Sequence, residues 1–402
     1  MNILILNPNI TTGGAQRTVL NLAYYLERLG NEVWLFTTLI DQKTIPEKFK
    51  NLKFIESKHK ILKAGGQTTQ YQNIDNLFLL LIRLFKIKFE LIKIIDQKKI
   101  DVVIVHQQPF NWVLAFYFKC PVIWNCFEPV ALWRPKDSNY FPLRVKKNNF
   151  IQDILERVYE WIDKKIIRYG IKYIFVLSEQ TENQIYNLYK KRAIVFHPGI
   201  GPDLLSQKIN LKALKKYNLS SDFNILQVGQ FTYEKNQLLT IDVFKKIQQK
   251  IPKAKLILIG NGPLREKIEE KIRNLKLQES VILTGRLLPL NSLLLAAFYQ
   301  KADVLVFPSL IQSWGLVPFE ALAFGTIPLV SEKCGAAELI EKEKIGLVMK
   351  LSHDDYYRKL IYIYGHKGKI KEMAEKGKKY TLAKLTYKVY ARKIQEQLWK
   401  LR

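Results

Sequence analysis

FPSLIQSWGLVPFEALAFGTIPLV, at residues 307–330, is the stretch that decides the fold. It contains the end of an apolar strand, a loop with Gly315, a helix predicted from about Val317, and a second strand at Ile327–Val330. Pro318 fits the first helical turn, where its missing N–H group leaves no hydrogen bond unmade. Apolar strands joined by helices are typical of a parallel sheet that is covered on both faces. The stretch therefore predicts an α/β fold.

The same alternation of strands and helices extends over nearly the whole chain. Residues 193–203, AIVFHPGIGPD, contain two breaks of the Pro-Gly type and predict a linker between two halves. We expect two Rossmann-like, doubly wound domains that face a central cleft, over residues 1–198 and 199–381. A last helical pattern over residues 382–402 either stays with the second domain or returns to the N-terminal one. The predicted strands of the two halves are Ile3–Leu6, Val33–Thr37, Val102–Val105, Val122–Asn125 and Ile174–Leu177, then Ile225–Val228, Leu256–Ile259, Val281–Thr284, Val304–Phe307 and Ile327–Val330.

Composition and charge limit the classes of protein to which the chain can belong. Its 402 residues suffice for two domains, and a hydrophobic content of 48% excludes disorder over most of the chain. The net charge of +28 favours anionic partners such as nucleic acid, phosphorylated small molecules or an anionic membrane surface. The 3 cysteines cannot form a disulfide framework, and no Cys or His cluster suggests a metal site.

The sequence does not show the patterns of the segments that direct a chain to a membrane or through it. The N-terminus, MNILILNPNI, has neither the basic region nor the long apolar region of a signal peptide and predicts a strand. Charged residues interrupt the most apolar stretch, Leu77–Ile95, so no segment is expected to span a bilayer. We therefore expect a cytoplasmic protein.

Two loops at predicted strand ends are candidates for anion binding. Gly13 and Gly14 stand between a strand and a helix, where they let a ligand approach the backbone and the free helix amides. A strand–helix turn that needs positive φ explains these glycines equally well. In the second half, GQFTYEKN at residues 229–236 follows a strand, and Lys235 could reach a phosphate there or be one more solvated lysine. GNGP at residues 260–263 is a second loop with few side chains at the same edge.

The helix predicted from Val317 offers a third candidate. Its free amides at residues 315–317 and its dipole suit a diphosphate. Glu320 lies about one turn inside this helix among apolar residues, so its carboxylate needs a partner. That partner is either a hydroxyl-rich ligand or an amide of a neighbouring loop.

Together, residues 309–330, the glycine pair, GQFTYEKN and GNGP resemble the family-4 retaining glycosyltransferases of the GT-B fold, in order and spacing along essentially the whole chain. The resemblance implies that the N-terminal domain takes the acceptor and the C-terminal domain binds a nucleotide-diphosphate sugar. It implies that Lys235 holds the donor diphosphate, that Glu320 holds the ribose, and that Gly14 faces the phosphate across the cleft. His106, after the strand Val102–Val105, matches a family histidine near the transferred sugar, although a histidine at a strand end is more often structural.

The chain departs from the family pattern at two positions. Gln312 replaces the first glutamate of the family's Glu-x7-Glu, and Gln230 stands where an arginine is usual. Gln230 has precedent in loops that are similar to those of the lipid-linked-oligosaccharide mannosyltransferases. The catalytic residues implied are His106, Lys235, Gln312 and Glu320, and the substrate-binding ones are Gly13, Gly14, Gln230, Lys235, Gly262, Gln312, Gly315, Leu316, Val317 and Glu320.

By this resemblance, the reaction moves a hexose, either mannose or glucose, with retention at the anomeric carbon. The sequence contains no Asp-x-Asp, so neither a metal ion nor another cofactor is expected. Fixed amides, the helix dipole and Lys235 would carry the charge of the leaving diphosphate. No carboxylate nucleophile is evident, which agrees with the front-face attack inferred for the family.

Two segments suggest where the acceptor lies. Residues 74–95 carry polar side chains on a narrow stripe, which predicts either a deeply buried helix or a helix that also lies on lipid. Residues 133–147 mix aromatic and cationic residues, which suits a membrane interface or a lipid-phosphate acceptor. A solvated active-site loop explains this mixture equally well. We expect a lipid-linked or oligosaccharide acceptor and peripheral attachment to the anionic inner face of the cell membrane.

Two other classes of protein compete with this hypothesis. A nucleotide-sugar-binding protein without transferase activity is favoured by Gln230 and Gln312. A basic nucleic-acid-binding protein is favoured by the charge alone, but the sequence lacks a base-reading helix, a zinc site and an aromatic single-strand motif, so no nucleic acid is expected as a partner.

Overall fold

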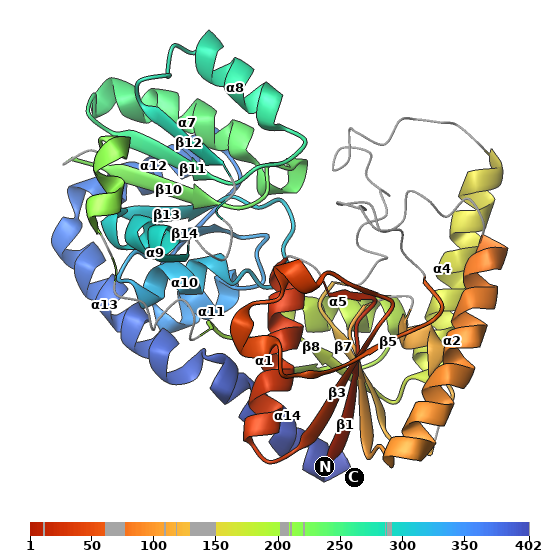
Figure 1. Ribbon diagram of the computed structural model, residues 1–402. Coiled ribbons are helices and arrows are strands. Elements are labelled where there is room, and N and C mark those ends of the chain that lie inside the picture. Colours follow the sequence, from red (N-terminus) through yellow and green to blue (C-terminus); the bar gives the residue numbers. More distant parts are fainter. Residues whose placement is uncertain are drawn as a thin grey trace. The chain divides into compact units, whose positions relative to one another are not determined.

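Two parallel sheets organise the chain in the computed structural model, which describes residues 1–10, 13–60, 77–107, 110–117, 119–128, 150–201, 209, 211–219, 222–285, 287 and 292–401. The described residues divide into two compact units. The first contains residues 1–198 and 387–401, and the second contains residues 199–386. Figure 1 shows the helices and strands of each unit.

The first unit is built on a seven-stranded parallel sheet. Its strand order is β5-β3-β1-β6-β7-β8-β9, so the chain starts in the middle of the sheet and extends to both edges. Two short strands, β2 (Asn9–Ile10) and β4 (Leu39–Ile40), pair separately. The strands of the large sheet are β1 (Asn2–Leu6), β3 (Glu32–Thr37), β5 (Lys53–Glu56), β6 (Val102–Val105), β7 (Val122–Cys126), β8 (Tyr173–Val176) and β9 (Ile194–Val195).

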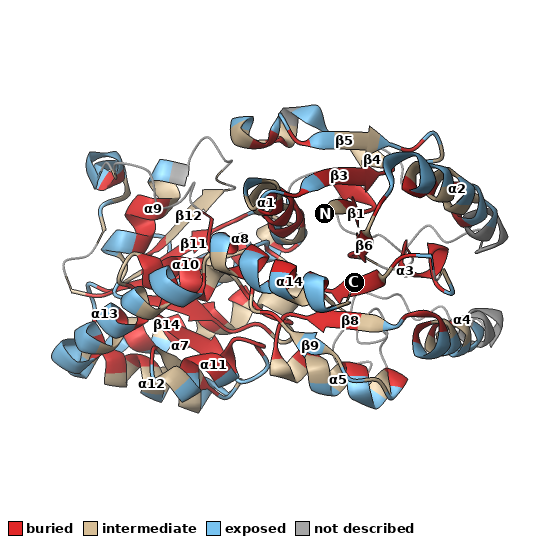
Figure 2. Ribbon diagram, turned by 90° about the horizontal axis from the view of Figure 1, so that it is seen from below, coloured by how far each residue is buried: buried red, intermediate tan, exposed pale blue. Residues whose placement is uncertain are grey.

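Helices cover both faces of this sheet, as Figure 2 shows. One face packs in a single apolar cluster against α2 (Leu77–Lys98), α3 (Phe110–Val113), α4 (Phe150–Gly170) and α5 (Glu179–Tyr189). On the other side lie α1 (Gly14–Arg28) and α14 (Tyr387–Leu401), which contact each other. The Thr18 and Tyr387 hydroxyls are 2.9 Å apart, and Asn125 Nδ2 donates to the Tyr390 hydroxyl at 3.1 Å. The last helix therefore packs on the first unit.

A buried carboxylate ties three helices of the first unit together. Asp163 of α4 accepts hydrogen bonds from Trp112 Nε1 of α3 and from the Tyr189 hydroxyl of α5, each at 2.7 Å. Two neutral donors to one buried carboxylate replace the water that burial removes. These contacts fix the side of α4 that faces the sheet and leave its opposite side toward solvent.

The second unit has a six-stranded parallel sheet in the order β12-β11-β10-β13-β14-β15. Apolar clusters fill both faces, so this sheet is doubly wound too. Its strands are β10 (Asn224–Val228), β11 (Lys255–Ile259), β12 (Val281–Gly285), β13 (Val304–Phe307), β14 (Ile327–Ser331) and β15 (Leu347–Met349). Its α-helices are α7 (Gln237–Lys250), α8 (Arg265–Asn274), α9 (Ser292–Lys301), α10 (Val317–Ala323), α11 (Ala337–Glu343), α12 (His353–Gly365) and α13 (Lys367–Lys384).

The predicted α/β class with two doubly wound sheets is confirmed. Each predicted strand coincides with an observed one to within one or two residues at its ends. The edge strands β5, β9 and β15 were missed, because each is only two to four residues long and carries too little apolar sequence to form a pattern. Within the described ranges, no helix has both the length and the apolar character needed to cross a bilayer.

Candidate active site

The loops that follow β11, β10 and β13 meet at one edge of the second sheet, with the loop after β10 in the middle. The strands β11, β10 and β13 are neighbours, and parallel strands present their carboxyl ends at the same edge. The middle loop is hydrogen-bonded to both others, since Phe231 N donates to Asn261 O at 3.0 Å and Leu310 N donates to Glu234 O at 2.9 Å. The backbone of this edge is thus one connected hydrogen-bonded layer.

Glycines allow two of these loops to touch. A Cβ atom at Gly260 would lie 1.9 Å from the Gly229 carbonyl oxygen, and one at Gly262 would lie 2.5 Å from the Phe231 carbonyl oxygen. Both distances are far below a van der Waals contact, and both neighbours are backbone, which cannot move aside cheaply. Gly262 was predicted to bind substrate, and in the structure its missing side chain serves loop packing.

Lys235 and Gln312 come together at this edge. The Lys235 ammonium, at the end of the short 3-10 helix η5 (Tyr233–Lys235), donates a hydrogen bond to Gln312 Oε1. It also lies 5.5 Å from the centre of the Phe307 ring. Both side chains are half-buried. Among the described residues, no carboxylate forms an ion pair with this ammonium, so its charge is available to an anionic ligand.

The backbone around Gln312 is held in place as well. Gly335 N donates to Gln312 O at 2.8 Å, and Ala336 N donates to Trp314 O at 3.2 Å. The loop after β13 is therefore attached to the loop after β14. A substitution of the Gln312 side chain leaves these backbone bonds intact.

Glu320 is buried on α10, and its partner comes from α9. The Tyr299 hydroxyl donates to Glu320 Oε2 at 2.8 Å. Tyr299 is thus one partner of this carboxylate, in addition to the ligand or loop amide considered from the sequence. Sequence analysis missed Tyr299, although a tyrosine inside the apolar stretch SLLLAAFYQK is a sign of a buried hydroxyl that needs an acceptor.

The start of α10 follows the predicted turn. Gly315 has φ +92°, a left-handed conformation that favours glycine, and a Cβ atom there would lie 3.0 Å from the Phe307 ring. Phe319 N and Glu320 N both donate to Leu316 O, at 3.0 and 2.9 Å. The amides of residues 315–317 therefore precede the first bonded turn of the helix. Gln230, the last predicted residue of this unit, is exposed, and its carbonyl accepts from Gln237 Nε2 at 2.9 Å.

The remaining predicted residues belong to the first unit. Gly13 and Gly14 are exposed at the start of α1. A Cβ atom at Gly14 would have no atom within 4 Å, whereas one at Gly13 would meet the end of the flexible Gln16 side chain. Packing does not require a glycine at position 14.

His106 lies at the carboxyl edge of the first sheet and is fully buried. Its ring contacts the Phe127 ring, with 4.8 Å between the ring centres. Among the described residues, neither of its nitrogen atoms has a hydrogen-bond partner. Burial lowers the pKa of His106 to about 3, because the charged form would lose its hydration. The imidazole is therefore neutral at pH 7, with a donor and an acceptor that no described residue uses.

Asn7 and Asn125 lie in the same row as His106, and sequence analysis missed both. In the sheet, Leu6 pairs with Val105 and Val105 pairs with Trp124, so the next row contains Asn7, His106 and Asn125. The Oδ1 atoms of both asparagines are buried without a hydrogen-bond partner in the described part of the chain. The signal available was a polar residue at the end of an apolar strand, in NILILN and VIWNC.

Comparison with known families accounts for both units. The family described as Glycosyltransferase Family 4 matches residues 12–204, and the family described as Glycosyl transferases group 1 matches residues 212–380. The first match covers most of the first unit, and the second contains the three loops described above. The chain belongs to the group 1, family 4 glycosyltransferases. The resemblance drawn from the motifs is thereby confirmed.

Individual glycosyltransferases resemble the chain over different lengths. An uncharacterized glycosyltransferase of Methanocaldococcus jannaschii is 30% identical over 262 residues, which are 63% of this chain and 60% of that relative. The alpha-1,3/1,6-mannosyltransferase of Yarrowia lipolytica is 23% identical over 397 residues, which are 86% of this chain and 80% of the relative. The solved structure of Anabaena HepE in complex with UDP and glucose has a TM-score of 0.73 at 15% identity, with 100% of both chains covered. This likeness supports the expected GT-B fold.

The loop at residues 133–147, predicted to bind lipid or acceptor, lies outside the described residues. In the ranges that are described, no three His, Cys, Asp or Glu side chains gather in a way that could hold a metal ion.

The buried imidazole predicts a pH-dependent stability. The pKa of His106 is 6.5 in an ordinary setting and about 3 in the folded chain. Between these values the unfolded chain takes up a proton that the folded chain does not, so lowering the pH favours unfolding. Lowering the pH from 7 to 5 should therefore reduce the free energy of unfolding by about 2 kcal/mol through His106. Denaturant unfolding at both pH values measures this decrease in stability. The His106→Gln variant should lack the part of the decrease that comes from His106. An identical loss in parent and variant contradicts the assignment.

Proposed function

We propose that the chain transfers a hexose from a nucleotide-diphosphate sugar to a lipid-linked or oligosaccharide acceptor, with retention and without a metal ion. The observation that supports this most is the Lys235–Gln312 pair, because a cation and an amide lie together at the carboxyl edge of the second sheet, where open α/β sheets commonly bind ligands.

The donor diphosphate is proposed to bind Lys235 and the amides of residues 315–317. These groups are fixed before the ligand arrives, so they can stabilise the charge of the departing nucleoside diphosphate without reorganising. The α10 dipole adds to the same potential. Glu320 would hold the ribose through the carboxylate oxygen that does not accept from Tyr299. Tyr299 then acts as a positioning residue for this carboxylate.

The sugar is proposed to contact Gln312 and His106. Gln312 offers both an acceptor and a donor to sugar hydroxyls. A neutral, buried imidazole can do the same, and Asn7 and Asn125 extend its row of unused polar atoms. The similarity to a mannosyltransferase and to HepE with UDP and glucose supports mannose or glucose as the sugar.

Retention and metal independence are the finer parts of the proposal. No Asp-x-Asp is present in the sequence to hold a nucleotide-bound metal, and the donor groups named above supply positive potential instead. A retaining reaction through a covalent intermediate needs a carboxylate nucleophile. Glu320, the carboxylate of the helix that follows the loop after β13, is engaged by Tyr299, which favours attack from the front face aided by the leaving phosphate.

A nucleotide-sugar-binding protein without transferase activity is the second candidate, favoured by Gln312 and Gln230. Donor binding and donor turnover separate the two. A thermal-shift screen with UDP, GDP, ADP and dTDP sugars should show stabilisation by one nucleotide class, worth about 2.7 kcal/mol at 100 times Kd. No stabilisation by any of the four classes contradicts both candidates. Stabilisation without sugar transfer supports the second.

A further inference from the structure

The outward face of α4 combines aromatic side chains with cations. Of the α4 side chains that the structure describes, the exposed ones are Arg157, Val158, Trp161, Lys165, Arg168 and Tyr169, and none is acidic. Trp161 is 62% exposed, a large apolar area for a side chain of a folded protein to leave in water. Glu160, next to this face, is paired with Lys164 at 2.7 Å.

Cations and rings on α4 are in direct contact. The Lys165 ammonium lies 5.9 Å from the centre of the Trp161 ring and 5.6 Å from that of Tyr169. The Arg168 guanidinium lies 5.7 Å from the Tyr169 ring. Side chains with an apolar body and a polar or charged end suit a boundary where one side is apolar and the other is wet.

The outward face of α2 also combines apolar side chains with cations, and one acidic side chain, Asp96, is exposed near its C-terminal end. Ile82, Phe85 and Phe89 are exposed at helical spacing, with Lys86 and Lys93 beside them. The Phe85 and Phe89 rings contact edge to face, with centres 4.8 Å apart. The opposite side of α2 is buried in the apolar cluster of the sheet, so only the outward face is available.

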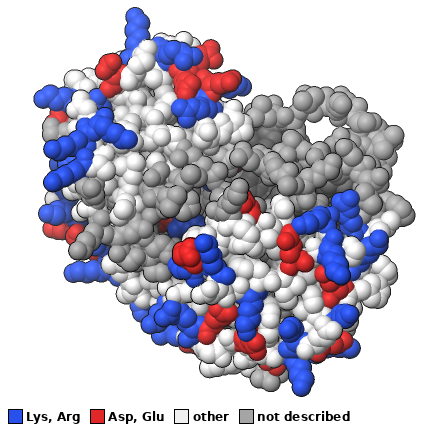
Figure 3. Space-filling model, in the orientation of Figure 1, with Lys and Arg blue, Asp and Glu red and all other residues white. Residues whose placement is uncertain are grey.

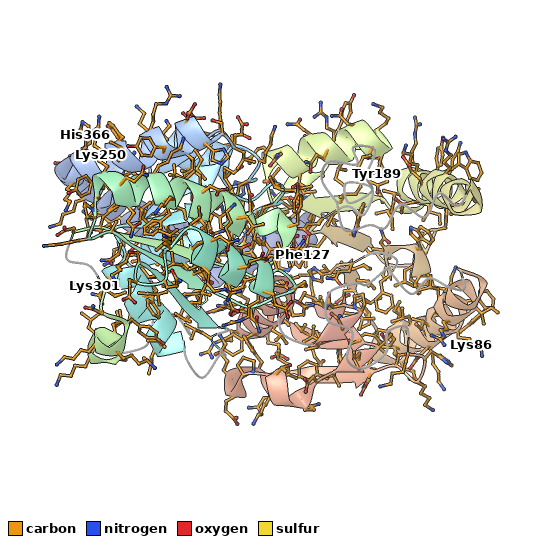
Figure 4. All side chains as sticks on the ribbon, turned by 90° about the horizontal axis from the view of Figure 1, so that it is seen from above. Lys86, Phe127, Tyr189, Lys250, Lys301 and His366 are labelled. Atoms are coloured by element: carbon orange, nitrogen blue, oxygen red, sulfur yellow. The ribbon has the colours of Figure 1, made fainter. Side chains whose placement is uncertain are left out.

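The two faces lie on one layer of the first unit. Both α2 and α4 contact α3 and cover the same side of the sheet (Figures 1 and 2). Figure 4 shows Lys86 on the outer side of α2, away from the strands, and Figure 3 shows Lys and Arg side chains grouped where α2 lies. The two helices flank α3 on one side of the sheet, and their two aromatic and cationic outward faces are called here together the α2–α4 surface.

We infer that the α2–α4 surface binds an anionic lipid bilayer at its interface. Each cation near an anionic leaflet adds attraction, and the aromatic and aliphatic side chains insert among the head groups. The proposal deepens the proposed function, because a bilayer at this unit would bring a lipid-linked acceptor to it. Nucleic acid fits less well, since the cations alternate with bulky exposed apolar groups.

Vesicle co-sedimentation of the full chain tests this surface. We expect binding to phosphatidylglycerol-containing vesicles, little binding to pure phosphatidylcholine, and weaker binding as salt shortens the Debye length from about 30 Å at 0.01 M to about 8 Å at 0.15 M. The Trp161→Ser/Tyr169→Ser and Phe85→Ser/Phe89→Ser variants should each bind at least tenfold more weakly. Trp399→Ser is the matched control, because Trp399 is 60% exposed on α14, and it should bind like the parent.

Besides a parent that does not bind anionic vesicles, three outcomes overturn the inference. The first is unchanged binding by both double variants, and the second is an equal loss in Trp399→Ser. The third is a change of sedimentation in the double variants without lipid, which would assign the surface to a second copy of the chain. Donor-induced thermal stabilisation is measured on the same samples. If the parent binds vesicles but no donor stabilises it, the proposed function is contradicted and the membrane inference is not. If donors stabilise the parent and every variant but the parent does not bind anionic vesicles, the membrane inference is contradicted and the proposed function is not.

Discussion

Replacing Lys235 by alanine should lower donor-dependent transfer about 10- to 100-fold. A charge-assisted contact with a diphosphate is worth about 1.5–3 kcal/mol, and the variant loses it in the transition state, where the leaving group carries the most charge. The fold should be unaffected, since Lys235 is only half-buried in a loop and its backbone bonds remain. Steady-state kinetics with saturating acceptor measure the effect.

The matched control for this variant is Lys253→Ala. Lys253 is exposed in the same unit, but it precedes β11 and so lies at the opposite edge of the sheet from the three loops. It should transfer like the parent. If Lys235→Ala also transfers like the parent, Lys235 does not hold the diphosphate.

Gln312→Ala should lower transfer about tenfold or more. One hydrogen bond to the sugar is worth roughly 0.5–1.5 kcal/mol, and the loss of an acceptor for the Lys235 ammonium adds to the cost. Gln312→Glu keeps the shape and should stay within about tenfold of the parent or change the preferred sugar. It also puts a carboxylate beside the ammonium, which lowers the positive potential that the diphosphate meets.

Kinetics with several donor sugars distinguish these outcomes. An unchanged rate and sugar preference in Gln312→Ala would place this residue outside the donor site. A parent that is inert with every donor, together with an active Gln312→Glu, would identify the chain as a degenerate transferase and overturn the main proposal.

The strands and loops that carry the proposed donor site could be predicted because local sequence encodes them. The central strands are mainly apolar and buried, and each loop begins where the strand ends. The place of Lys235 at the ligand-binding edge follows from its position after β10 alone. The family resemblance rested on the same loops and was confirmed by the comparisons.

Contacts between distant segments could not be predicted, because no local pattern encodes them. Lys235 and Gln312 are 77 residues apart, and Asn125 and Tyr390 are 265 apart. A buried tyrosine or asparagine gives no sign in a single sequence of the partner that satisfies it. The same holds for α4, whose outward face is defined by the bonds of Asp163 on its inner side.

The proposed reaction is tested most directly by measuring sugar transfer to a polyprenyl-phosphate-linked acceptor in the presence of EDTA. The donor is the nucleotide sugar that stabilises the protein in the thermal-shift screen. The released nucleoside diphosphate is quantified, and NMR gives the anomeric configuration of the product. We expect one nucleoside diphosphate to be released for each sugar transferred, with the donor's anomeric configuration kept and no loss of rate from EDTA. Absence of transfer from every donor, or an inverted product, would contradict the proposed reaction.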